Sequence, residues 1–105
     1  MGYVYLIEDS QNNSYKIGMT KNLEKRIKAL QTGNSCELKF LCAYKTDYPY
    51  RLETMLHNKF AQYKELNEWY NLPKDIVLDF HSYCWQMNNY IKSLIDNPYF
   101  AKNLK

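Results

Sequence analysis

The chain has 105 residues, a formal net charge of +3, 46% hydrophobic side chains and 24% charged side chains. That length fits one compact domain, large enough to bury a hydrophobic core without a structural metal or disulfide bonds. No apolar run is long enough to cross a bilayer, and the first residues lack the basic and then apolar pattern of a secretion signal. We therefore expect neither a membrane-spanning nor a secreted protein, and we expect a cytoplasmic location.

Cysteine usage and charge distribution narrow the class further. The three cysteines, Cys36, Cys42 and Cys84, form no C-x-x-C motif, and their odd number is typical of reduced thiols in the cytosol. No cysteine pair lies near a histidine at zinc-ligand spacing, which argues against a zinc site. The charge is uneven, because residues 16–28 carry +4 and the remainder of the chain −1. The chain therefore has a local basic patch, which differs from a uniformly basic protein.

The first half of the chain predicts a hairpin, a helix and a further strand. Residues 3–7 are β-branched and aromatic, which predicts a strand, and a polar loop over 9–14 leads to a returning strand at 15–18. Apolar residues at helical spacing (Leu23, Ile27, Leu30) predict a helix, with Thr20 or Asn22 as its cap and Gly33 after its end. A third strand is expected over residues 38–44.

The second half predicts two helices. One begins at about Pro49 and carries apolar residues on one face (Leu52, Leu56, Phe60, Tyr63). The other begins near Pro73, a favoured position for proline, and runs to Asn97-Pro98. The element order predicts an α+β fold: a small three-stranded antiparallel sheet flanked by helices, with a long C-terminal helix.

The hairpin register places a glycine beside a tyrosine. If the loop spans residues 9–14, Glu8 pairs with Tyr15, and Tyr5 lies opposite Gly18. Gly18 would leave open space above the Tyr5 ring, and Lys16 would be a diagonal neighbour of that ring. A phenol and an ammonium beside an open notch could support chemistry, or they could belong to an ordinary half-exposed sheet face.

The first predicted helix combines an apolar stripe with basic residues. Lys21, Lys25 and Lys28 project away from the stripe, and Arg26 lies at its border. A border arginine can offer a planar donor fork to phosphate oxygens, although it could equally pair with a surface carboxylate. The lysines fit either a nucleic-acid contact or a solvated helix face.

The second predicted helix carries Glu53 and His57, which are neighbours at a spacing of four. One carboxylate at the border of an apolar stripe can hold Mg²⁺, with phosphate and water completing its coordination shell. The alternative is a surface Glu-His pair that stabilises the helix. Trp69, expected in a loop at 68–70, either closes the edge of the core or stacks on a base.

Several segments together carry a resemblance to a known family. They are Tyr3-Val4-Tyr5, Lys16-Ile17-Gly18, residues 20–26 ending at Arg26, residues 30–33, Glu53-x-x-Leu56-His57-x-x-Phe60 and Glu68-Trp69-Tyr70. In this order the sequence resembles the GIY-YIG endonuclease family, particularly its subgroup from phages, large DNA viruses and some bacteria. The resemblance covers Tyr3 to about Leu72 of a single domain 1–105, and residues 73–105 form a helical extension outside it.

The resemblance implies hydrolysis of DNA phosphodiester bonds with one divalent metal, Mg²⁺ or Mn²⁺. By this resemblance Tyr5 is the general base, Arg26 stabilises charge on the scissile phosphate, and Glu53 ligates the metal. Lys16 stands in place of the second-motif tyrosine and would assist Tyr5. His57 would hold Glu53 or protonate the leaving oxygen. The expected DNA contacts are Lys21, Lys25, Lys28 and Trp69.

Two other functions share the expected fold. One is a nucleic-acid-binding module with weak or no hydrolytic activity, and the other is a protein-interaction domain. The expected partner is DNA, together with a DNA-binding partner protein or a second copy of the chain, and no membrane is expected as a partner.

Overall fold

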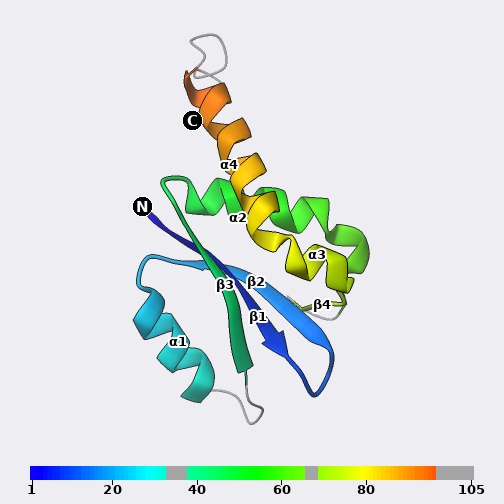
Figure 1. The fold of residues 1–105 in the computed structure, drawn as a ribbon. Coiled ribbons are helices and arrows are strands. Elements are labelled where there is room, and N and C mark those ends of the chain that lie inside the picture. The colour runs from blue at the N-terminus through cyan, green and yellow to red at the C-terminus, as the bar shows by residue number, and fades with distance from the viewer. Residues whose placement is uncertain (33–37, 66–68, 97–105) are drawn as a thin grey trace.

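The computed structural model describes residues 1–32, 38–65 and 69–96, and Figure 1 shows an α+β fold. One antiparallel sheet has the strand order β3-β1-β2-β4. Its strands are β1 (Gly2–Asp9), β2 (Ser14–Thr20), β3 (Leu38–Thr46) and β4 (Trp69–Tyr70). The expected α+β class is confirmed, but the expected count of three strands is wrong. The segment expected as a loop forms β4, because Trp69 and Tyr70 pair with Lys16 and Tyr15 of β2.

Helices cover both faces of this sheet (Figure 1). They are α1 (Leu23–Thr32), α2 (Pro49–Lys59), α3 (Lys74–Leu78) and α4 (Phe80–Asp96), with a short 3-10 helix η1 (Ala61–Tyr63) after α2. Among the described residues, no helix has the length and apolar character needed to span a bilayer.

Two helix predictions need correction. The second helix ends at Lys59, and Tyr63 belongs to η1 instead of continuing it. The long C-terminal helix is divided at Asp79, whose backbone (φ −96°, ψ 10°) ends α3 just before α4 begins. Ile76 and Phe80 lie on either side of this turn, and both are buried. The turn therefore lets two successive helices place apolar side chains in one core.

The hairpin register agrees with the sequence-based prediction. Tyr5 pairs with Gly18, and Glu8 pairs with Tyr15. The Asp9 carboxylate accepts hydrogen bonds from the backbone N–H of Gln11 at 3.2 Å and from the Asn12 side-chain amide at 2.8 Å. Asn13 adopts the left-handed conformation (φ 51°), which asparagine tolerates well in turns. These contacts in the turn thus set the pairing of β1 with β2, and with it the side chains that lie on each face of the sheet.

The face of the sheet under α2, α3 and α4 forms the larger part of the core. In the described part of the chain, this large core contains thirteen buried residues: Val4, Leu6, Tyr15, Ile17, Leu52, Leu56, Phe60, Tyr70, Leu72, Ile76, Phe80, Cys84 and Ile91. Leu52 and Leu56 of α2 have no solvent exposure, as the predicted apolar stripe requires. Burial of this apolar surface is the main stabilising contribution to the fold.

The opposite face, next to α1, carries a smaller group of apolar residues. This small cluster consists of buried Tyr5, Ile7 and Leu38, with Leu30, Phe40 and Trp69 packed against them. No residue of α1 is fully buried. The predicted stripe of Leu23, Ile27 and Leu30 is only half-buried, so α1 buries little apolar surface against the sheet.

A β-bulge lets β3 contribute to both faces. The pairing register between β1 and β3 shifts between Leu6 and Ile7, whose partners are Cys42 and Phe40, so that Leu41 is the extra residue. Phe40 packs against the small cluster, whereas Cys42 packs against the large core. Every second side chain of β3 therefore points to the small cluster before the bulge and to the large core after it.

A few predictions fall on residues outside the described ranges. These are Gly33 after the first helix, Cys36, Glu68 and the Asn97-Pro98 end of the last helix. The other two cysteines, Cys42 and Cys84, are free thiols.

Candidate functional site

Tyr5 and Arg26 are joined by a hydrogen bond between a buried and an exposed residue. Tyr5 has no solvent exposure and lies 5.5 Å, between ring centroids, from Phe40. Arg26, on the exposed surface of α1, donates its Nε–H to the Tyr5 hydroxyl oxygen at 3.0 Å. A phenol held by the small cluster thus fixes the direction of a guanidinium at the surface.

Gly18 is required by this contact. A Cβ atom at Gly18 would lie 2.3 Å from the Tyr5 hydroxyl oxygen and 2.5 Å from Cζ of the same ring. The prediction of open space above Tyr5 is therefore wrong, because the Tyr5 side chain itself fills the space that Gly18 leaves. The alternative of a half-exposed sheet face is also wrong here, since Tyr5 and Ile7 are both buried.

Arg26 has exposed lysines nearby, as the sequence predicts. Lys25 and Lys28 belong to α1, Lys21 precedes it, and all three are exposed. Asn22 caps the helix by accepting a hydrogen bond from the Lys25 backbone N–H at 3.0 Å. A shallow pocket of about 220 Å³ lies beside them, lined by Thr20, Asn22, Lys25, Arg26 and Ala29. This surface offers cationic and amide donors to an anion.

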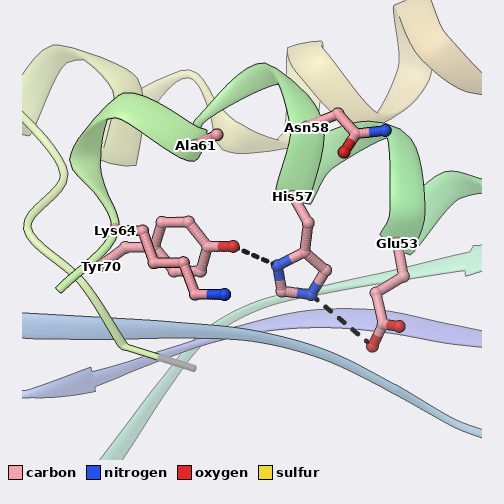
Figure 2. A pocket seen from close by; sticks show the side chains of 6 residues that line it. All are labelled: Glu53, His57, Asn58, Ala61, Lys64 and Tyr70. Atoms are coloured by element: carbon pink, nitrogen blue, oxygen red, sulfur yellow. Dashed lines mark hydrogen bonds and ion pairs between the residues drawn. The ribbon is translucent and has the colours of Figure 1, made fainter. Parts of the chain in front are cut away.

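A second group of polar side chains belongs to α2 and β4. The His57 ring hydrogen-bonds through Nδ1 to the Tyr70 hydroxyl, and its Nε2 lies 4.0 Å from Glu53 Oε2. Figure 2 shows the three side chains in a row, with Lys64 beside Tyr70. They line an open pocket of about 390 Å³ together with Asn58 and Ala61. The predicted neighbourhood of Glu53 and His57 is confirmed.

Tyr70 is the residue of this group that the sequence analysis did not single out. It appeared only as the last residue of Glu68-Trp69-Tyr70, with no role. Its contact with His57 depends on the pairing of β4 with β2. That pairing could not be predicted, because a strand of two residues has no periodic pattern of apolar side chains. An aromatic residue with a hydroxyl in an otherwise apolar core was the available signal, since such a hydroxyl needs a partner.

Tyr5 and α2 lie on opposite faces of the sheet. Tyr5 lies across Gly18 of β2 on the α1 face, whereas α2 packs against β2 from the opposite face. The pocket beside Arg26 and the pocket beside Glu53 have no lining residue in common. The structure therefore brings together Tyr5 with Arg26, and Glu53 with His57. The convergence of both groups on one phosphate stays a prediction.

Lys16 and Trp69 lie next to each other on the face that carries Tyr5. Lys16 pairs with Ile7 on β1 and with Trp69 on β4. Trp69 is half-buried and packs against the small cluster, as expected for a residue that closes the edge of the core. A role of Trp69 in stacking on a base stays a prediction.

Tyr15 has a structural role on the face of the hairpin opposite Tyr5. It is buried in the large core, and its hydroxyl donates to Glu8 Oε2 at 3.2 Å. Burial raises the pKa of Tyr15, and the neighbouring Glu8 carboxylate raises it further. Tyr15 therefore remains a neutral phenol and does not compete with Tyr5 for a proton-accepting role.

The donor set suits a hard cation with few protein ligands. Within the described ranges, no three His, Cys, Asp or Glu side chains gather as a metal cluster. Glu53 is a single carboxylate, with a side chain 23% exposed, that lines a polar pocket. Mg²⁺ is commonly held by one or two carboxylates, with substrate phosphates and water as its other ligands. Glu53 fits such a site.

Comparisons with known proteins agree with the viral character of the resemblance. Residues 2–85 match the T5orf172 domain. Over 82 residues the chain is 32% identical to a protein of Invertebrate iridescent virus 6 that is named for a KilA-N domain (315L). The alignment covers 72% of this chain and 35% of the viral protein, so the chain spans about a third of its relative. No solved structure matches the chain.

Proposed function

The chain belongs to the T5orf172 domain family, which is found in phage and viral nuclease-like proteins, and we propose that it is a metal-dependent DNA endonuclease. The observation that carries the proposal is the hydrogen bond from Arg26 to buried Tyr5, because it orients a surface guanidinium beside a basic patch. The resemblance to GIY-YIG endonucleases supports the same assignment, since it gives these two residues roles in cleavage.

Arg26 is the proposed phosphate-binding residue. Its Nε–H is engaged by Tyr5, and this contact sets the plane of the whole guanidinium group. A planar fork of fixed direction can bind two oxygens of one phosphate and offset the charge that develops during hydrolysis. The surrounding lysines of α1 would hold the flanking phosphates of the strand.

Glu53 is the proposed metal ligand, with Mg²⁺ or Mn²⁺ as the cation. When bound, a divalent cation supplies positive charge that offsets the negative charge developing on the phosphate. His57 lies within 4.0 Å of the Glu53 carboxylate, so its proposed role is to hold that carboxylate in place. Asn58 and Lys64 line the same pocket and add polar groups for a DNA phosphate.

Tyr5 is the proposed general base toward the attacking water, assisted by Lys16. Its burial sets a condition on this role, because DNA binding must open a path for water to a hydroxyl without solvent exposure. Tyr5, as the phenolate, would accept the proton of the water as its oxygen attacks phosphorus. The P–O bond to the leaving 3′ or 5′ oxygen would break, and that oxygen would take a proton from solvent.

A nucleic-acid-binding module without hydrolysis is the second candidate function. The complete burial of Tyr5 favours it, because a buried phenol that accepts a hydrogen bond from Arg26 can position the guanidinium without any contact with water. The exposed lysines of α1 would serve such a module equally well, and the name of the viral relative refers to a KilA-N domain. DNA is the proposed partner in both cases.

A cleavage assay distinguishes the candidates. Supercoiled plasmid, branched DNA and single-stranded DNA are incubated with the protein in Mg²⁺ or in EDTA. A nuclease of the proposed kind nicks DNA only with the metal, and Arg26→Lys and Glu53→Gln each lower the rate by about 100-fold or more, as loss of a transition-state contact does. Salt-sensitive binding without cleavage supports the second candidate, and neither binding nor cleavage supports a protein-interaction domain.

Matched variants make this assay specific. Arg51→Lys changes the second arginine of the chain, and Glu24→Gln changes an exposed carboxylate on α1. Both should leave nicking within about twofold of wild type, because surface substitutions away from a site have small effects. If they slow nicking as strongly as the site variants do, the assigned residues are wrong.

A further inference from the structure

Tyr70 is a buried residue with a polar end in the Glu53 pocket. It is 1% exposed and belongs to the large core, yet its hydroxyl reaches the His57 ring (Figure 2). The two rings lie 5.4 Å apart between centroids at an interplanar angle of 34°. The phenol therefore contacts the imidazole through both its ring and its hydroxyl.

The backbone around Tyr70 is fixed on both sides. β4 pairs with β2 through Tyr15 on one side and forms a bridge to Lys64 on the other. Next to this bridge, the Asn71 N–H donates to the Tyr63 carbonyl at 2.8 Å. A residue held in this way offers its hydroxyl from a constant position, which is what orienting another side chain requires.

The two nitrogens of His57 have different surroundings. Nδ1 contacts the Tyr70 hydroxyl, and Nε2 faces the Glu53 carboxylate at 4.0 Å. A neutral imidazole carries hydrogen on one nitrogen only, and the partner of each nitrogen decides which one. A carboxylate favours N–H on the nitrogen that faces it, whereas a hydroxyl can donate as readily as accept. These surroundings favour a neutral ring with its hydrogen on Nε2 and with Nδ1 as the acceptor of the Tyr70 hydroxyl hydrogen.

We propose that Tyr70 is a positioning residue, which donates its hydroxyl hydrogen to His57 Nδ1 and holds the Nε2–H of the neutral imidazole toward Glu53. The large core thereby orients the Glu53 carboxylate indirectly, because Tyr70 holds His57 and His57 faces Glu53. The proposed tautomer of His57 can be correct whether or not the protein cleaves DNA. Its use for placing a metal ligand rests on the proposed nuclease function, in which Glu53 holds the cation.

Nitrogen NMR of the wild-type protein tests the tautomer directly. The chain has two histidines, so a long-range ¹H–¹⁵N spectrum contains two rings, and His81, which packs edge-on against Tyr44 at 5.2 Å, is the internal reference. In spectra recorded at increasing pH until the ring is neutral, His57 should show a pyridine-type shift at Nδ1 and a pyrrole-type shift at Nε2. The opposite pattern, or averaged shifts for both nitrogens, overturns the proposal.

Tyr70→Phe tests the role of the hydroxyl while keeping the ring. The two nitrogen shifts of His57 should move toward averaged values, and those of His81 should stay unchanged. Tyr15→Phe is the matched control, because it removes another buried hydroxyl of the large core, one that contacts Glu8. Unchanged His57 shifts in Tyr70→Phe would overturn the proposal, and the wild-type spectrum decides the tautomer even if this variant unfolds.

Cleavage is measured separately on the same variants. If the proposed function is also correct, Tyr70→Phe lowers the nicking rate by about 10-fold or more at saturating DNA, as loss of a residue behind a metal ligand does. A His57 tautomer that depends on Tyr70, in a protein without nicking activity, would leave the positioning role intact and reject only the nuclease.

Discussion

The two faces of the sheet differ in what holds them together. Among the described residues, the face under α2, α3 and α4 packs thirteen buried side chains into the large core. The small cluster on the α1 face has three buried side chains, and none of them comes from α1 itself. One face therefore supplies most of the buried apolar surface, and the other depends more on individual contacts such as that between Arg26 and Tyr5.

This difference shows how a small domain can keep most of its stabilising burial on one face and its surface charge on the other. A helix that rests lightly on a sheet can present cationic side chains at the surface without burying their charge. Its orientation must then come from specific contacts, and the Tyr5 hydroxyl provides one. The large core can in turn extend a polar chain, Tyr70 to His57 to Glu53, into a pocket at its border.

The largest expected effect is loss of a large-core side chain. Leu56→Ala should lower the free energy of unfolding by about 2–5 kcal/mol, because Leu56 is fully buried and its removal leaves a cavity. Leu30→Ala, its counterpart on α1, should cost about 1 kcal/mol, since Leu30 is only half-buried. Urea denaturation measures both values. Equal losses would show that the two faces contribute alike and would remove the contrast.

Gly18→Ala should disturb the α1 face alone. The added methyl would meet the Tyr5 ring at a forbidden distance, and overpacking of this kind costs about 1–3 kcal/mol. The same substitution in a Tyr5→Leu background should cost much less, because the hydroxyl and the end of the ring are gone. If the cost is the same in both backgrounds, contact with Tyr5 is not the reason for glycine at this position.

High pH should weaken the large core through its thiol. Burial raises the pKa of Cys84 to about 12 from an ordinary value of 9.0, and the neighbouring Cys42 contributes to this rise. The folded state therefore keeps a proton that the unfolded state loses, and stability falls as pH rises from about 9 to 12, by up to about 1.4 kcal/mol per pH unit. Urea denaturation at several pH values in this range measures the free energy of unfolding, which should fall less steeply with pH in Cys84→Ala than in the wild type. If it falls equally steeply in both, other groups cause the loss.

Tyr5→Phe should have the smallest effect on stability, about 1 kcal/mol or less, because the lost hydrogen bond involves an exposed arginine. Its effect on nicking separates the two roles of Tyr5. If Tyr5 only positions Arg26, adding Tyr5→Phe to Arg26→Ala should not lower the rate further. If Tyr5 is also the general base, the double variant should be slower than Arg26→Ala alone, and rates at several pH values check this.

Sequence reasoning succeeded where local chemistry decides the structure. Turn-forming residues after β1 fixed the register that places Tyr5 opposite Gly18. The helical spacing of Glu53 and His57 predicted their contact. Both relations depend on residues close together in the sequence or across a tight hairpin, where backbone geometry leaves few alternatives.

Sequence reasoning failed where the outcome depends on distant partners. Gly18 indicated that space is left opposite Tyr5, but the sequence did not show that the Tyr5 ring itself would fill that space. A two-residue strand has no periodicity, so β4 and the contact between Tyr70 and His57 could not be predicted. The break at Asp79 interrupts an apolar pattern that continues on both sides of it, so the pattern alone predicts one helix.

The bulge in β3 makes the length of that strand as informative as its composition. Leu38 and Phe40 lie in the small cluster, whereas Cys42 and Tyr44, at the same alternation, pack against the large core. Leu41 is the extra residue between them, and the bulge that holds it places Phe40 opposite Ile7 and Cys42 opposite Leu6, which are neighbours on opposite faces of β1. Deletion of Leu41 is thus expected to leave both pairs on their own faces, because Phe40 and Cys42 would then follow each other in strict alternation. Deletion of Lys39 or Ala43 would instead act as a frameshift in three dimensions, which moves part of the strand to the other face, and should be far more harmful.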